Sequence, residues 1–227
     1  MPRVTKERDE RREEFIEASK ALFNKKGFEN TTVDDIVDAV GVAKGLFYYY
    51  FESKDALLDE ITDAFVQEIK MAITSAASRG DLSAVAKMEL LLEASGDIKV
   101  KSMALVRYFH EARNRHLHLA VEERVMEFLV PALQDIIRQG VEEGVFDTKQ
   151  PHHASLAIIG AGRAISHEWT DRLSAGEVME MVSAYQALAE RMLGARPGTL
   201  DVYSRLVKKN LAKVTSSGRR GPRRQGK

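Results

Sequence analysis

Apolar residues recur at helical spacing along almost the whole chain, and this pattern limits the fold more than any other feature. Strand-like alternation is almost absent, and only five prolines interrupt the 227 residues. Side chains three, four and seven positions apart share one face of an α-helix. A first such stripe is formed by Phe15, Ala18, Leu22 and Phe23. The sequence therefore predicts an all-α protein.

Glycines and capping residues divide this pattern into separate helices. Gly27 closes the first, and Thr32, or alternatively Thr31, caps a second that Gly41 ends in a left-handed conformation. A short helix over 43–50 follows, and Ser53 can cap a longer one. Pro131 predicts a kink or a restart, and Pro151 suits the first position of a helix. Later helices are expected over 82–94, 98–118, 121–143, 152–173, 176–193 and 199–213.

Composition excludes several classes of function. The absence of cysteine excludes disulfides, cysteine-ligated zinc and thiol chemistry. No phosphate-binding loop or nucleophile elbow is present, so we expect neither an enzyme nor a cofactor. The sequence shows no secretory signal and no apolar stretch long enough to cross a membrane, which predicts a cytoplasmic protein without a membrane partner.

Overall charge gives little guidance, because 34 basic residues balance 34 acidic ones. The balance is uneven along the chain. No acid follows Asp201, and the basic segment 215–227 is predicted to be disordered. This tail could attract phosphates or simply remain solvated.

Residues 31–54, TTVDDIVDAVGVAKGLFYYYFESK, are the most informative segment. Two short helices joined by a tight glycine-containing turn are typical of a helix-turn-helix. From Ala39 to Phe51 there is no acidic residue, although acids lie on both sides. We therefore expect a phosphate-bearing partner to approach this surface without meeting a carboxylate.

The segment GVAKGLFYYYFESKDAL resembles the recognition-helix signature of the TetR family of bacterial regulators. Gly27-Phe28 followed by Thr31-Thr32-Val33 and Ile36 fits as well. The resemblance covers about residues 11–65, and beyond them only the helical layout and the ending Gly140…Gly144-Val145-Phe146 are similar. Tyr50 stands where the family often has His, and Val42-Ala43 carry no hydroxyl.

The resemblance implies a double-stranded DNA operator as the partner and assigns residues to its binding. Thr32 would give its hydroxyl and backbone N–H to a phosphate, and Lys44 would reach a phosphate or a guanine edge. Tyr48 and Lys54 match phosphate-binding positions of the family. The implied DNA-binding residues are Thr32, Lys44, Gly45, Tyr48, Tyr49, Tyr50 and Lys54. Phe47 and Phe51, spaced i and i+4, are predicted to be core, and one of the three tyrosines could also be packing.

The resemblance also implies two functional domains and a dimer. Residues 1–54 would bind DNA, and 55–214 would bind an effector and dimerise. Helices 152–173 and 176–193 would form the homodimer interface, where small residues allow close approach. The alternative is that these small residues pack within one protomer. They are Ser155, Ala157, Gly160, Ala161, Gly162 and Ala164.

A small hydrophobic or amphipathic effector is expected in the larger domain. Its predicted contacts are Met88, Met103, Tyr108, Phe109, His110, Met126, Phe128, Arg163, His167 and Trp169, although such residues on a helix are often plain core. The six histidines lack the spacing of a shared helical metal site, so no metal is expected.

The resulting hypothesis is a dimeric repressor that its effector releases from a palindromic operator. Two alternatives remain: a DNA-binding regulator of the same fold without an effector, and an all-α ligand-binding protein that does not bind DNA.

Overall fold

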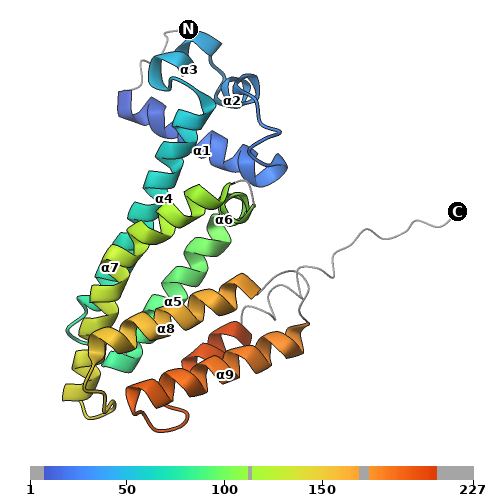
Figure 1. Cartoon of the computed structure of the whole chain (residues 1–227). Coiled ribbons are helices and arrows are strands. Elements are labelled where there is room, and N and C mark those ends of the chain that lie inside the picture. Colours follow the sequence, from blue (N-terminus) through green and yellow to red (C-terminus); the bar gives the residue numbers. More distant parts are fainter. Residues whose placement is uncertain (1–7, 112–113, 169–173, 209–227) are drawn as a thin grey trace, which may run out of the picture. The chain divides into compact units, whose positions relative to one another are not determined.

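The chain folds into helices joined by short turns (Figure 1). The computed structural model describes residues 8–111, 114–168 and 174–208. Every regular element within these ranges is helical, which confirms the all-α prediction. A further helical segment covers 202–208. The labelled helices are α1 (Arg8–Lys26), α2 (Val33–Val40), α3 (Lys44–Tyr50), α4 (Lys54–Ala77), α5 (Ala84–Lys101), α6 (Met103–His110), α7 (Arg115–Glu142), α8 (Pro151–Glu168) and α9 (Ala175–Leu193).

The turns around the two short helices form as the sequence predicts. Gly27 and Gly41 have φ angles of 84° and 74°, a left-handed conformation that glycine adopts without steric cost. The Gly41 N–H donates to the Val37 carbonyl at 2.8 Å and so closes α2. Ser53 accepts a hydrogen bond from the Ala56 N–H at 3.0 Å, as expected for a residue that caps α4.

The later helices differ from the predictions at one place and decide between two alternatives at another. The single helix expected over 98–118 is instead the end of α5, the whole of α6 and the start of α7. The Asn114 side chain donates to the Tyr108 carbonyl at 2.8 Å and thereby supports the end of α6. No restart occurs at Pro131, because α7 runs through it without a break. Pro131 is exposed, so water can satisfy the carbonyl group that the missing N–H leaves behind.

The described residues divide into two compact units, one within 1–71 and 95–126 and the other within 72–94 and 127–227. This division describes packing, so the functional boundary predicted after residue 54 stays a prediction. In the first unit Phe15 of α1 lies edge-on to Phe47 and to Phe51, with ring centroids 5.7 and 5.9 Å apart. All three rings are buried, which confirms Phe47 and Phe51 as core.

In the second unit α8 packs against α9. The Tyr185 hydroxyl of α9 donates to the Ile158 carbonyl of α8 at 3.1 Å. Phe146, after α7, folds back against Gly140, where a β-carbon would overlap its ring. No helix in the described ranges is long and apolar enough to cross a membrane.

Candidate nucleic-acid interface

The first turn of α2 is fixed by a reciprocal capping box. Thr32 has an extended backbone, its hydroxyl accepts from the Asp35 N–H at 3.1 Å, and its own N–H donates to Asp35 Oδ2 at 2.7 Å. The prediction of Thr32 as the cap is therefore confirmed. Thr31 lies buried instead and donates its hydroxyl to the Gly27 carbonyl at 2.8 Å.

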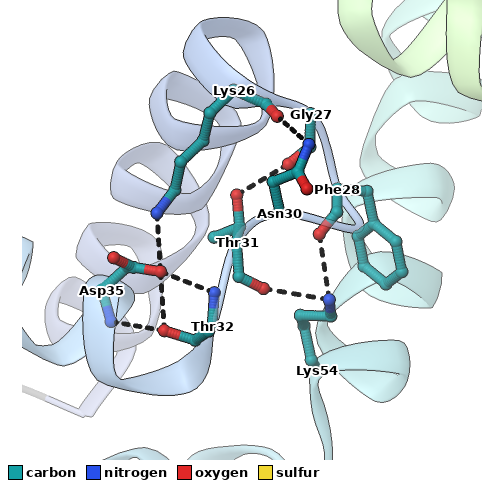
Figure 2. A network of polar contacts seen from close by, with 8 residues as sticks. All are labelled: Lys26, Gly27, Phe28, Asn30, Thr31, Thr32, Asp35 and Lys54. Carbon is teal, nitrogen blue, oxygen red and sulfur yellow. Dashed lines mark hydrogen bonds and ion pairs between the residues drawn. The ribbon is translucent and has the colours of Figure 1, made fainter.

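Asp35 also forms an ion pair with Lys26, whose Nζ lies 2.6 Å from Asp35 Oδ2 (Figure 2). The hydrogen bond from Lys26, followed by those from Thr32, holds the pKa of Asp35 well below its usual range. Both Thr32 groups that were expected to contact a phosphate are thus directed at Asp35. A phosphate could use them only after Asp35 moves, and their role in DNA binding stays a prediction.

Helix α3 presents its tyrosines in two different ways. Tyr48 and Tyr49 are exposed, at 53% and 63% of their surface, whereas the neighbouring Phe47 is fully buried. Tyr50 is half-buried, and its ring lies 5.8 Å from that of Phe15. Two tyrosines therefore face outward, and the third contributes to packing.

Lys44, the first residue of α3, forms an ion pair with Asp34 of α2 at 2.8 Å. Both side chains are largely exposed. This pair corrects the expectation that a phosphate would meet no carboxylate here, because an acid outside the span 39–51 reaches back to the first residue of α3. The hydrogen bond that the Lys44 ammonium group donates to Asp34 raises the pKa of Lys44 above its usual value.

Lys54, the first residue of α4, is directed at the turn between α1 and α2. Its ammonium group donates to the Phe28 and Thr31 carbonyls, each at 2.9 Å, and lies 4.1 Å from the centre of the Phe28 ring (Figure 2). The side chain is half-buried. Because these contacts engage the ammonium group, Lys54 holds the turn in this structure, and its predicted phosphate contact stays a prediction.

Two further features lie near α3. Gly45 is exposed, and a β-carbon there would meet no atom within 4 Å. The guanidinium group of Arg8 lies 5.6 Å from the centre of the Tyr49 ring. Sequence reasoning missed Arg8, and the only available signal was the basic character of the first dozen residues.

The predicted effector residues fall in both compact units. Within the first unit, Phe109 is buried, and the Tyr108 ring lies 4.9 Å from that of Phe28. Met88 is buried in the second unit. Met126, Phe128 and Arg163 are half-buried, and His110 is exposed. The side chains of Met103 and His167, and all of Trp169, lie outside the described part, and the effector site stays a prediction.

A groove of about 460 Å³ lies in the first unit between α1, α4 and the junction of α5 with α6. None of the predicted effector residues lines it. Phe23, Ile61, Phe65 and Leu105 supply its apolar lining, and Glu17 and Glu68 are among its charged residues. No group of three or more His, Asp or Glu within the described ranges could hold a metal ion, although the His110 and His118 rings lie 4.6 Å apart.

Comparison with known proteins agrees with this geometry. The sequence model of "Bacterial regulatory proteins, tetR family" matches residues 15–61, which include α2, α3 and most of α1. The HTH-type transcriptional regulator YfiR of Bacillus subtilis is 29% identical over 66% of this chain and 75% of its own. The repressor KstR2 of Rhodococcus jostii is 32% identical over 50% of this chain and 54% of its own.

A solved TetR/AcrR-family regulator from Thermobifida fusca is 25% identical, with a TM-score of 0.59. The similarity covers 81% of this chain and 97% of that one. These relatives are transcriptional regulators rather than enzymes. The matched profile covers α3, the helix that presents Lys44, Tyr48 and Tyr49. Residues 15–61 therefore resemble the DNA-binding segment of the tetR family, and the chain as a whole is similar in fold to a TetR/AcrR-family transcriptional regulator.

Proposed function

We propose that this regulator is a repressor that binds a palindromic operator as a homodimer and leaves it when a small hydrophobic or amphipathic molecule binds. The observation that supports DNA binding is that α3 has one buried face and one exposed face. Phe47 anchors the helix in the core, while Tyr48 and Tyr49 are exposed beside Lys44. Repression is favoured by the relative KstR2, which is named a repressor. We also propose a cytoplasmic location, because DNA is the proposed partner.

The DNA-binding surface comprises Lys44, Tyr48 and Tyr49, with Gly45 allowing close approach to the groove. Three further residues stabilise the helices around this surface. Thr32 caps α2, Tyr50 packs against Phe15, and Lys54 binds the turn between α1 and α2. Tyrosine hydroxyls and lysine ammonium groups donate hydrogen bonds to phosphates, and a tyrosine ring can contact a thymine methyl group.

Selection of bound duplexes from a random DNA pool, followed by fluorescence anisotropy, tests this surface. Lys44→Ala and Tyr48→Ala are expected to weaken binding to the selected duplex. Lys70→Ala removes an exposed lysine from α4 and serves as the matched control. Undiminished binding by both α3 variants would refute the assignment.

The proposed dimer interface lies on α8 and α9. Some small residues of α8 pack within the protomer: Ser155 is buried and Gly162 lies against Tyr185. Others are exposed and so available to a second copy, namely Ala157, Gly160 and Ala164. Leu156 of α8 and Leu188 of α9 are exposed as well, at 40% and 51%. Exposed apolar and small residues on adjacent helices favour contact with a second copy.

A dimer would also place two α3 helices about 34–36 Å apart to read successive major grooves. Analytical ultracentrifugation of Leu188→Glu tests the interface. We expect this variant to dissociate into monomers and to lose operator affinity, whereas Met71→Glu, at an exposed position of α4, stays dimeric. A dimeric Leu188→Glu protein would refute this interface.

The effector step is a displacement of α4 that changes the spacing of the two α3 helices. Met88 in the second unit and Phe109 in the first are each buried, so each unit has an apolar interior in which a hydrophobic ligand could bind. A thermal-shift screen of hydrophobic compounds, repeated on the operator complex, tests the step. Compounds that raise the melting temperature of the free protein should release DNA, and retention of DNA by all of them would contradict it.

A further inference from the structure

The ion pair between Asp34 and Lys44 links the two helices of the helix-turn-helix at its exposed surface. Asp34 lies in the first turn of α2, and Lys44 begins α3 after the left-handed turn at Gly41. Asp34 Oδ1 lies 2.8 Å from the Lys44 ammonium group, and the two side chains retain 66% and 51% of their exposed surface. The pair therefore lies where DNA would approach Lys44.

Asp34 and its neighbour Asp35 have different roles. Asp35 is committed to the turn through Lys26 and both donors of Thr32, so it belongs to the local fold. Asp34 shares none of these contacts. Its carboxylate interacts with a lysine that the resemblance assigns to DNA, and a carboxylate and a phosphate are the same kind of acceptor for an ammonium group.

We propose that Asp34 is an internal competitor of the DNA backbone, occupying Lys44 in the free protein and lowering the affinity for DNA. The inference rests on the proposed function, in which Lys44 contacts a phosphate. When DNA binds, the Lys44 ammonium group must leave Asp34 for the phosphate or bind both acceptors at once. In either case the Asp34 carboxylate remains as a negative charge near the duplex. Asp34 therefore sets how strongly the protein binds DNA of any sequence.

The exposure of the pair makes it a regulator of affinity rather than a block. Solvent-exposed ion pairs are weak because water and salt screen both charges. DNA can therefore open the pair at small cost. Each phosphate contact contributes a slope of about −0.9 to the dependence of log K on log salt concentration, which is about 8-fold between 1 M and 0.1 M salt. Near 0.1 M salt, release of Lys44 is therefore expected to add up to about 8-fold per protomer.

Salt-dependent anisotropy with a duplex of arbitrary sequence, about 30 base pairs long, measures this effect without knowledge of the operator. Titrations span about 50 to 200 mM salt, where phosphate contacts dominate nonspecific binding. The proteins are wild type, Asp34→Asn, Lys44→Ala and the double variant. Asp38→Asn is the matched control, because it removes the same charge from an exposed position of α2. Thermal unfolding checks that each variant is folded.

We expect Asp34→Asn to bind about two- to eight-fold more tightly per protomer, with a steeper salt slope. The gain should be much smaller in the Lys44→Ala background, where only the repulsion between Asp34 and the duplex is removed, and much smaller for Asp38→Asn. No gain, or an equal gain without Lys44, would overturn the inference. Failure of the proposed function looks different: wild type would show no salt-dependent binding, or Lys44→Ala would bind as well as wild type.

Discussion

Replacement of Lys54 by methionine would separate a phosphate contact from a structural role. Methionine keeps most of the methylene stem and removes the ammonium group. The structure directs that group at the Phe28 and Thr31 carbonyls, each at 2.9 Å, and at the Phe28 ring. Residues Phe28 and Thr31 are 7% and 1% exposed, so little water can replace the lost donor.

The size of the effect follows from these contacts. A hydrogen bond to a charged group contributes about 1.5–3 kcal/mol, and an exposed cation–π contact about 0.5–1 kcal/mol. Lys54 is half-buried, so water screens part of this sum. We expect Lys54→Met to lower the free energy of unfolding by about 2–4 kcal/mol.

Urea denaturation at fixed protein concentration measures the loss, and anisotropy on random-sequence duplex measures DNA affinity. Lys44→Met is the matched control, because its ammonium group lies in an exposed pair. It should weaken DNA binding and leave the unfolding midpoint nearly unchanged. If Lys54→Met instead weakened DNA binding while costing less than about 1 kcal/mol of stability, the structural role assigned to Lys54 would be refuted.

Three further substitutions test other parts of the structure. Gly140→Ala forces a β-carbon into the Phe146 ring and should cost about 1–3 kcal/mol in urea denaturation; an unchanged midpoint would contradict this packing. Gly45→Ala, with no atom within 4 Å of the new carbon, should retain or raise stability yet weaken DNA binding in anisotropy. Asp35→Asn should lower the melting temperature at neutral pH. Since the folded-state pKa of Asp35 is depressed, its contribution to stability is present above about pH 4 and is lost at lower pH. A difference in melting temperature between wild type and variant that did not change with pH would exclude this contribution.

The local features of the helix-turn-helix could be predicted because each depends on residues close in sequence. The Thr32 cap, the left-handed Gly41 and the buried Phe47 follow from capping rules and helical spacing. The contacts of Lys44 and Lys54 could not be predicted. Each joins residues on different elements, at distances set by the turn conformations. The break after α6 was missed because a single asparagine, Asn114, supports it within an otherwise helical pattern.

Buried or half-buried lysines hold both ends of α4, which gives the proposed effector step a physical route. At its start, Lys54 binds carbonyls of the α1–α2 turn. At its end, the buried Lys87 of α5 donates to the carbonyl of Ala77, the last residue of α4, at 2.9 Å. α4 is a helix of 24 residues, and each of its ends is held within its own compact unit by one of these lysines. We expect a displacement of the Lys54 end of α4 to pull on the carbonyl groups of Phe28 and Thr31, and thus on the turn that begins α2.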